Sequence, residues 1–275
     1  MNLANVKLLR RLILPLFARL NPGDITITHH FTGDKVFLHS FKHKGYWFYG
    51  KKREKDTMEL FRRLIRPADT IIEIGGHIGY VSLYFANLAN KGSVYVFEPG
   101  PNNLPYLKKN VRGKANVTVI EKGVGSANAT LPFYVDAISG QNNSFKENFE
   151  GFLISRAAAY YRDAGLGRVD VDVVRLDDFI AERALSPSFV KIDVEGYELP
   201  VIQGMLTALT NIRPMLMVEI QDDRSEIYDI ITNQGYVMFT DQLHVISNPD
   251  NLWFNTFCLH RIAHSPWLIE LGLSQ

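Results

Sequence analysis

The chain has 275 residues, with 30 Lys and Arg against 29 Asp and Glu, 46% hydrophobic residues and a single cysteine. A chain of this length can bury a full core without cross-links, and a lone Cys258 excludes an internal disulfide, so we expect a reducing, cytoplasmic location. The net charge of +1 gives no overall excess of positive charge for neutralising phosphates, which argues against a nucleic-acid partner.

The N-terminal residues are rich in apolar side chains, but no apolar run among them reaches the roughly 20 residues that a bilayer span needs. Their longest apolar stretch, Leu12–Ala18, is interrupted by Pro15 and has no cleavage signal after it, so we predict no secretion. Apolar residues at helical spacing, mixed with Lys and Arg, predict an amphipathic helix over residues 1–20. Such a helix either packs on the domain or lies peripherally on the inner face of a membrane.

Residues 25–50 alternate polar with apolar or aromatic side chains and contain a turn at Thr32-Gly33-Asp34, which predicts β-strands. An apolar face at Met58, Phe61 and Leu64 then predicts a helix, and Pro67 ends it. We therefore divide the chain into an N-terminal extension, residues 1–66, and a main domain, residues 67–275.

The main domain alternates short apolar runs with helical segments, which predicts a doubly wound α/β fold around a mostly parallel sheet. Its ligands are expected beyond the carboxyl ends of the strands. A last strand, reached through a non-helical connection, is expected to be antiparallel. The seven candidate strands are Thr70–Ile74, Ser93–Glu98, Val117–Glu121, Phe189–Asp193, Met215–Ile220, Tyr236–Thr240 and Trp253–His260, and the candidate helices are Tyr80–Leu88, Asn103–Val111, Leu199–Leu209 and Ser225–Gln234.

A glycine-rich turn follows the first of these strands, with glycines at positions 75, 76 and 79. Such glycines let the backbone approach a ligand at the start of a helix. Glu98 ends the next strand, where a carboxylate can accept ribose hydroxyls. The glycine spacing departs from the dinucleotide pattern, and Glu73 would repel a pyrophosphate but suits an ammonium group. The loop therefore favours S-adenosylmethionine over a nicotinamide dinucleotide, and the remaining alternative is a turn that binds nothing.

Three blocks of sequence make a resemblance specific: TIIEIGGHIGYVSL (70–83), VYVFEPGPNNLPYLKKNV (94–111) and VVRLDDFIAE through FVKIDVEGYELPVIQGM (173–205), with a weaker fourth, RPMLMVEI (213–220). The chain resembles FkbM-family methyltransferases, a branch of the class I S-adenosylmethionine-dependent enzymes. The resemblance implies a seven-stranded Rossmann-like sheet and O-methylation of a hydroxyl on a sugar or natural product. Most family members have Asp where this chain has Glu73, and Ala-Asn where it has Gly76-His77. The expected cofactor-binding residues are Glu73, Gly75, Gly76, Gly79, Glu98, Pro99, Gly123 and Asp193.

The KIDVEG block brings Lys191, Asp193 and Glu195 to the end of a strand, and alternation would place them on one side. An alcohol acceptor must lose its proton as the methyl group arrives, so we expect Asp193 or Glu195 to act as the base, with His77 as an alternative. Helix capping is the plainer explanation for these acidic residues. Carboxylates also suit Mg²⁺, although the spacing is not diagnostic of a metal, and we predict none.

Residues 139–172 interrupt the alternation and contain several aromatic and basic residues. They form either a lid over the acceptor or a crossover helix that simply packs. The expected acceptor contacts are Asn142, Asn143, Tyr160 and Glu219. We thus predict an O-methyltransferase for a small hydroxylated acceptor. The alternative is a catalytically silent S-adenosylmethionine- or nucleotide-binding module that acts through its N-terminal helix.

Overall fold

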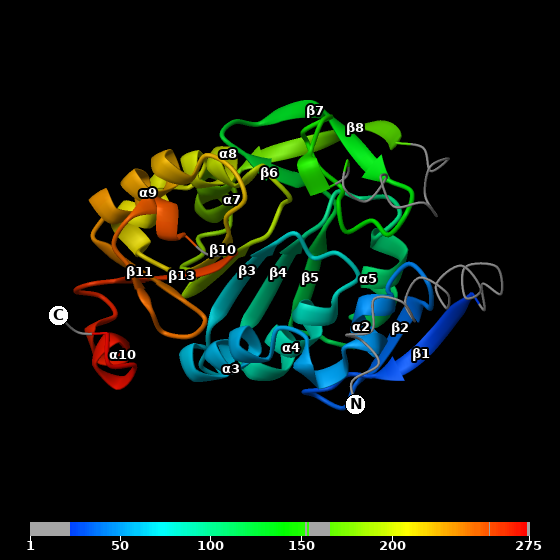
Figure 1. The fold of residues 1–275 in the computed structure, drawn as a ribbon, viewed down its shortest axis with the longest axis horizontal. Coiled ribbons are helices and arrows are strands. Elements are labelled where there is room, and N and C mark those ends of the chain that lie inside the picture. The colour runs from blue at the N-terminus through cyan, green and yellow to red at the C-terminus, as the bar shows by residue number, and fades with distance from the viewer. Residues whose placement is uncertain (1–22, 152, 154–165, 253, 274–275) are drawn as a thin grey trace.

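The computed structural model of the chain describes residues 23–151, 153, 166–252 and 254–273. Its centre is an eight-stranded sheet with the order β12-β11-β13-β10-β9-β3-β4-β5 (Figure 1). The strands are β3 (Thr70–Ile74), β4 (Ser93–Phe97), β5 (Val117–Ile120), β9 (Phe189–Ile192), β10 (Met215–Glu219), β11 (Tyr236–Thr240), β12 (Val245–Ile246) and β13 (Asn255–His260).

The pairing of these strands confirms the doubly wound, mostly parallel α/β fold. The pairs β3–β4, β4–β5, β3–β9 and β9–β10 are parallel, as βα crossovers require. Strand β13 runs antiparallel, as predicted, and it inserts between β10 and β11. The prediction of seven strands misses the two-residue β12, which pairs with the edge strand β11. A strand this short gives too little sequence pattern to be recognised.

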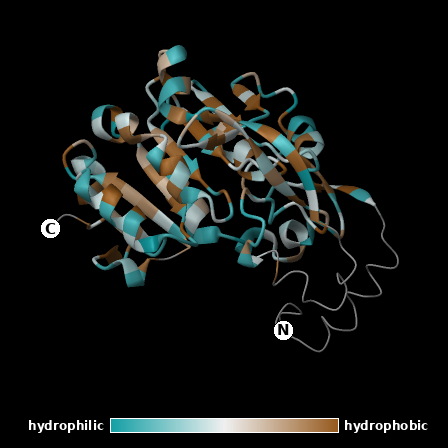
Figure 2. Ribbon diagram, turned by 90° about the horizontal axis from the view of Figure 1, so that it is seen from above, coloured by the Kyte–Doolittle hydropathy of each residue, from teal (hydrophilic) through white to brown (hydrophobic). Residues whose placement is uncertain are grey.

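Helices cover both faces of the sheet and give each face its own core. The helices are α2 (Lys44–Phe48), α3 (Lys55–Leu64), α4 (Tyr80–Leu88), α5 (Leu104–Asn110), α7 (Leu176–Glu182), α8 (Glu198–Gln203), α9 (Arg224–Asn233) and α10 (Ser265–Glu270). Several helical ribbons change between hydrophilic and hydrophobic colours along their length (Figure 2), as expected of helices with one face on a core. Among the described residues, no helix combines the length and the apolar character that a bilayer span requires.

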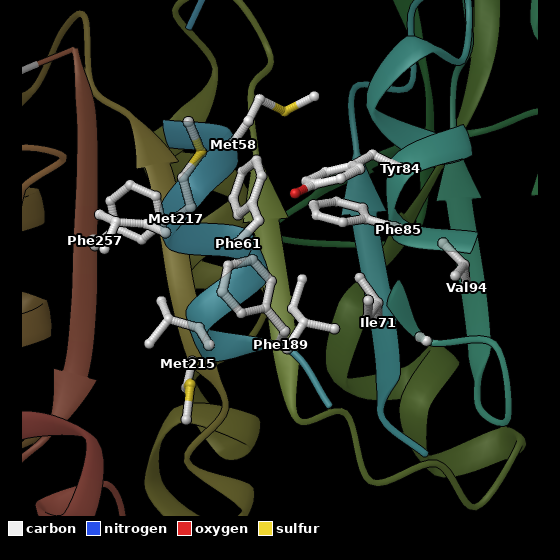
Figure 3. Close-up of a cluster of buried hydrophobic side chains, with 14 of the residues drawn as sticks. Met58, Phe61, Ile71, Tyr84, Phe85, Val94, Phe189, Met215, Met217 and Phe257 are labelled. Atoms are coloured by element: carbon white, nitrogen blue, oxygen red, sulfur yellow. The ribbon is translucent and has the colours of Figure 1, made fainter. Parts of the chain in front are cut away.

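Alternation along the strands divides the buried side chains between these two cores. Ile71 belongs to the core under α3 and α4, whereas its neighbour Ile72 belongs to the core under α7, α8 and α9. In the first core, the ring of Phe61 from α3 lies 4.9 Å from that of Phe85 and 5.7 Å from that of Phe189 (Figure 3). Helix α3, which the sequence-based division assigns to the N-terminal extension, therefore packs in the core of the main domain.

The N-terminal extension begins with the predicted hairpin, formed by β1 (Asp24–Thr28) and β2 (Lys35–His39). The strand expected after it is wrong, because residues 44–48 form α2 and residues 50–52 a 3₁₀ turn. The ring of His39 accepts the backbone N–H groups of Phe41 and Lys42, which turns the chain before another strand can start. The Asn110 side chain bonds both backbone groups of Phe37, which fixes the hairpin against α5.

A second sheet, which sequence analysis misses, lies beside the first. It has the order β6-β8-β7, with β6 (Gly123–Gly125), β7 (Ala129–Asp136) and β8 (Leu166–Arg175). The predicted lid over residues 139–172 therefore includes residues 166–172, which belong to β8 and pair with β7. Of the remaining lid, residues 139–151 follow β7 and are tied back by an isolated bridge between Tyr134 and Ser144.

Candidate active site

A cavity of about 270 Å³ opens where β3, β4, β9 and β10 end. This is the edge at which a doubly wound sheet binds ligands. It brings together most of the residues that the sequence singles out; the structure places Gly79 outside the lining, and Tyr160 lies outside the described residues. The predicted site residues that line the cavity are Glu73, Gly75, Gly76, His77, Glu98, Pro99, Gly123, Asn142, Asn143, Asp193, Glu195 and Glu219.

The glycine loop needs its first glycine for a steric reason. Gly75 has φ +89, and a Cβ there would lie 1.7 Å from the carbonyl oxygen of Asp193. The N–H groups of Gly75 and Gly76 both donate to the carbonyl of Phe97, which anchors the loop to β4. Gly79, with φ +82, starts α4 against Leu107, so its contacts are with the protein. Position 75 therefore has to be glycine, and its backbone forms part of the cavity lining.

Glu73 lies beneath the loop with one oxygen unsatisfied. Its Oε2 accepts from Ser82 Oγ at 2.5 Å, whereas Oε1 has no hydrogen-bond donor among the described residues and lies 3.8 Å from Lys191 Nζ. Burial raises the pKa of Glu73 to about 7. Asn103 Oδ1 is a second buried acceptor on the cavity wall without a described donor. Unsatisfied buried acceptors are costly, so the cavity suits a ligand that carries hydrogen-bond donors.

Glu98 is already engaged by the protein. Its Oε2 accepts from the backbone N–H of His77 at 2.7 Å, and its Oε1 accepts from the N–H of Gly100 at 2.8 Å and from Asn103 Nδ2 at 3.2 Å. Burial raises the pKa of Glu98 to about 7. Because a carboxylate offers about four acceptor positions, roughly one remains for a ligand. The expectation that this side chain accepts both ribose hydroxyls is thus narrowed to one hydrogen bond.

His77 is held by its neighbours through both ring nitrogens. Its Nδ1 lies 3.0 Å from the hydroxyl of Tyr46 and its Nε2 lies 3.5 Å from the carbonyl of Ser139, which fits a tautomer with the proton on Nε2. Burial lowers the pKa of His77 to about 3, so the ring stays neutral. Its φ of +47 is unusual for a residue with a side chain. These contacts fit a structural role better than proton transfer.

Three carboxylates gather beside the glycine loop: those of Asp193, Glu195 and Glu219 each have an oxygen within 4.8 Å of the others. Strand β9 ends at Ile192, and Glu195 has φ +52, so a left-handed turn rather than strand alternation returns its side chain to the cavity. We call these three residues the acid cluster. Asp193 and Glu195 do lie on one side, as predicted, but strand alternation does not extend to Glu195 because β9 ends at Ile192.

The three residues of the acid cluster differ in their charged and hydrogen-bonding neighbours. Asp193 Oδ2 is paired with Lys191 Nζ at 2.9 Å. Burial and the charge of Asp193 raise the pKa of Glu195 to about 8. Repulsion from Asp193, followed by burial, raises the pKa of Glu219 well above its usual value. Gln221 Nε2 donates to Glu195 at 2.8 Å and to Glu219 at 3.2 Å, which holds the two carboxyl groups together.

The predicted acceptor residues before Phe145 have protein partners. Asn143 donates to Asn102 Oδ1 at 2.8 Å and accepts from the backbone N–H of Asp136 at 2.8 Å. Asn142 Nδ2 lies 3.5 Å from a carboxylate oxygen of Asp136. These bonds shape residues 139–145 into a cavity wall. Glu198, which follows the acid cluster residues of this loop, accepts the N–H of Gly196.

Comparison with known proteins assigns this site to a family. The family model of the methyltransferase FkbM domain matches residues 73–238, which hold the glycine loop, Glu98 and the acid cluster. The chain belongs to the FkbM methyltransferase family. This assignment agrees with the resemblance that the sequence motifs indicate.

Curated relatives of this FkbM family member are about a quarter identical to it over the aligned residues. A hexuronic acid methyltransferase, AglP, of Haloferax volcanii is 26% identical over 168 residues, which are 61% of this chain and 62% of AglP. A 31-O-demethyl-FK506 methyltransferase of Streptomyces tacrolimicus is 26% identical over 247 residues, 80% of this chain and 89% of that protein. The crystal structure of a methyltransferase FkbM from Methylobacillus flagellatus aligns with a TM-score of 0.45 and 16% identity, over 74% of this chain and 50% of that one.

The site of this FkbM methyltransferase also contains residues that sequence analysis misses. Tyr46, Arg53, Glu54 and Met58 line the cavity, yet all precede the matched domain. The Arg53 guanidinium lies 4.6 Å from the centre of the Tyr46 ring and pairs with Glu54 at 3.0 Å. No motif marks these residues, because tertiary packing alone brings them to the cavity. Gln221 lies two residues beyond Glu219, and alternation there could have indicated it.

Proposed function

We propose that this enzyme transfers a methyl group from S-adenosylmethionine to a hydroxyl group of a sugar or natural-product acceptor. The observation that carries the proposal is the acid cluster beside the glycine loop, which offers a proton acceptor next to a donor-binding turn. The named relatives support the acceptor class: one acts on a hexuronic acid, one on 31-O-demethyl-FK506, and a 23% identical protein of Sinorhizobium fredii is a 2-O-methyltransferase.

The charge of the cavity supports the proposed donor. Among the described lining residues, six are acidic and three are Lys or Arg, so the surroundings favour a ligand with cationic groups. When bound, S-adenosylmethionine supplies a sulfonium-activated methyl group, and its ammonium provides donors that suit Glu73 Oε1. We assign its ribose to the open position on Glu98 and its carboxylate to Arg53. Pro99 and Gly123 remain proposed contacts because they line the same cavity.

Among the predicted catalytic residues, we assign the base to Glu195. A base works best when its pKa lies near the working pH, and the pKa of Glu195, raised to about 8, meets this condition. Asp193 is less suited because its Oδ2 is already paired with Lys191 Nζ at 2.9 Å. The Glu195 carboxylate would take the proton of the acceptor hydroxyl as the hydroxyl oxygen bonds the methyl carbon, while the carbon–sulfur bond breaks and a neutral thioether leaves. Holding acceptor and donor in line supplies the rest of the rate enhancement.

We propose that the reaction needs no divalent metal. The acid cluster offers the oxygen ligands that Mg²⁺ prefers, but the Lys191 ammonium already occupies a position beside Asp193. Turnover should therefore persist in EDTA and should not rise when MgCl₂ is added. Loss of activity in EDTA that is restored by Mg²⁺ would assign the acid cluster to a metal instead.

Two measurements test the function itself. Calorimetry with S-adenosylmethionine, its demethylated product and NAD should detect binding of the first two and not of the third. Transfer of a radiolabelled methyl group to a panel of sugars, uronic acids and macrolides should then reveal the acceptor class. Absence of S-adenosylmethionine binding contradicts the proposal. Binding without transfer to any acceptor supports the alternative of a catalytically silent module.

A further inference from the structure

The positive and negative charges of this near-neutral chain are unevenly distributed along the sequence. Residues 23–114 contain 15 Lys and Arg against 8 Asp and Glu, whereas residues 115–275 contain 11 against 21. A net charge of +1 therefore hides a basic N-terminal part and an acidic C-terminal part. Charge asymmetry of this size indicates an anionic surface as partner for the basic part, because opposite charges orient the molecule as it approaches.

The basic charge is densest around α2. Residues 41–55, which we call the α2 segment, contain five lysines and one arginine against a single acidic residue, Glu54. Lys42, Lys51, Lys52 and Lys55 are exposed. Helix α5 packs on the neighbouring strand β2, and its exposed Lys109 lies 3.0 Å from the centre of the Phe37 ring in that strand. Figure 1 places α2, β2 and α5 near one another, so these lysines belong to one region of the fold.

Two aromatic side chains project from the same segment. Phe48 is 42% exposed and Tyr49 is 41% exposed, and their ring centres lie 5.3 Å apart. Exposed aromatic residues flanked by lysines are typical of proteins that lie on anionic membranes, since the rings enter the headgroup region and the ammonium groups pair with lipid phosphates. RNA can also bind aromatic and basic residues, but the −10 charge of residues 115–275 (11 Lys and Arg against 21 Asp and Glu) disfavours a polyanion that wraps the protein.

The α2 segment is also part of the cavity wall. Tyr46, Arg53 and Glu54 line the cavity, and the exposed Phe48 and Tyr49 lie between them in the sequence, so a surface that contacts these rings lies close to this wall of the cavity. We propose that the α2 segment binds an anionic lipid surface and thereby holds the mouth of the cavity at the membrane. An acceptor carried on a lipid would then reach the site without leaving the membrane. The proposal concerns binding alone and does not depend on the donor or on the reaction.

Vesicle co-sedimentation of the full chain tests the proposal. Vesicles of phosphatidylcholine with 30% phosphatidylglycerol should bind the protein, pure phosphatidylcholine should bind it far less, and salt should weaken binding. Two double variants remove the proposed contacts: Lys51→Gln with Lys52→Gln, and Phe48→Ser with Tyr49→Ser. At about 1 kcal/mol, or fivefold, per lysine near a membrane surface, the first should reduce partitioning by about thirtyfold. All four side chains are exposed, and thermal unfolding checks that the fold survives.

A matched control removes two charges elsewhere. Lys91→Gln with Arg261→Gln changes the net charge equally at exposed residues outside the α2 segment, and its partitioning should stay within about twofold of the wild type. Equal binding by the control and by both α2-segment variants overturns the proposal. Membrane binding would then be assigned to residues 1–22, which carry four Lys and Arg and no acidic residue. Failure to bind anionic vesicles, together with tight binding to single-stranded RNA, overturns it in favour of a nucleic-acid surface.

Discussion

The exchange of Glu195 for Gln removes one proton acceptor from the acid cluster and leaves its size nearly unchanged. The amide oxygen of Gln can still accept from Gln221 Nε2, which lies 2.8 Å from Glu195 Oε2, so the packing should survive. Loss of a general base lowers rates by about a hundred- to ten-thousandfold, and we expect the single-turnover rate to fall within this range. Affinity for S-adenosylmethionine should change by no more than a few-fold, because the change lies outside the proposed donor contacts.

The pH dependence of the wild-type enzyme supplies an independent check. A base must be ionised to accept a proton, so a pKa raised to about 8 means that the rate rises with pH through about 8 and then levels. From pH 7 to pH 9 the ionised fraction, and with it the single-turnover rate, should increase about tenfold. Removing the Asp193 charge by Asp193→Asn should move this midpoint to lower pH, because that charge helps to raise the pKa of Glu195.

Two results would refute this reasoning. A rate that is flat between pH 6 and pH 9 excludes a base with a raised pKa. Wild-type rates in Glu195→Gln, together with a large loss in Asp193→Asn, would transfer the role to Asp193, the other carboxylate that the sequence indicates. Wild-type rates in both variants would leave a reaction driven by proximity alone.

Further predictions concern the donor contacts and the buried carboxylates. Glu98→Ala removes a charge-assisted hydrogen bond to ribose, worth about 1.5–3 kcal/mol, so the calorimetric Kd for S-adenosylmethionine should rise at least tenfold; an unchanged Kd removes Glu98 from the ribose site. Arg53→Met should weaken S-adenosylmethionine binding about tenfold but leave the decarboxylated analogue unaffected, and equal losses for both ligands would contradict a carboxylate contact. Glu73 has its pKa raised from 4.5 to about 7, so the folded state holds this proton more tightly than the unfolded state and loses stability as pH rises between these values. Glu73→Gln lacks this loss, and urea unfolding should show it gaining up to roughly 3 kcal/mol over the wild type from pH 5 to pH 8; parallel pH profiles would exclude the effect.

Much of the central fold follows from the sequence because its strands are buried on both faces. The predicted bounds of β3, β11 and α4 match the structure, and the other parallel strands differ by one residue. The second sheet escapes detection for a physical reason. Strand β8 has one exposed face, so its apolar residues alternate with charged ones, and β6 has only three residues. Such patterns resemble loops unless the partner strand is known.

Only those site residues that lie at the ends of the parallel strands could be predicted from the sequence. Parallel strands bring Glu73, Glu98 and Asp193 to one edge, so their convergence could be predicted. The state of each group could not, because it depends on neighbours that pack from elsewhere, such as Ser82 on Glu73. The N-terminal wall was unforeseen for the same reason, since Tyr46 and Arg53 reach the cavity from a segment without a motif.

The close approach of Gly75 to Asp193 has an evolutionary consequence. The two loops touch through backbone atoms, and Lys191 Nζ further bonds the carbonyl of Gly75 at 3.1 Å, so neither loop can shift without the other. The floor of the cavity is therefore a rigid unit whose sequence can change little during evolution. New acceptor preferences should arise instead in the walls, residues 139–145 and the α2 segment, whose side chains can be exchanged while the floor stays fixed.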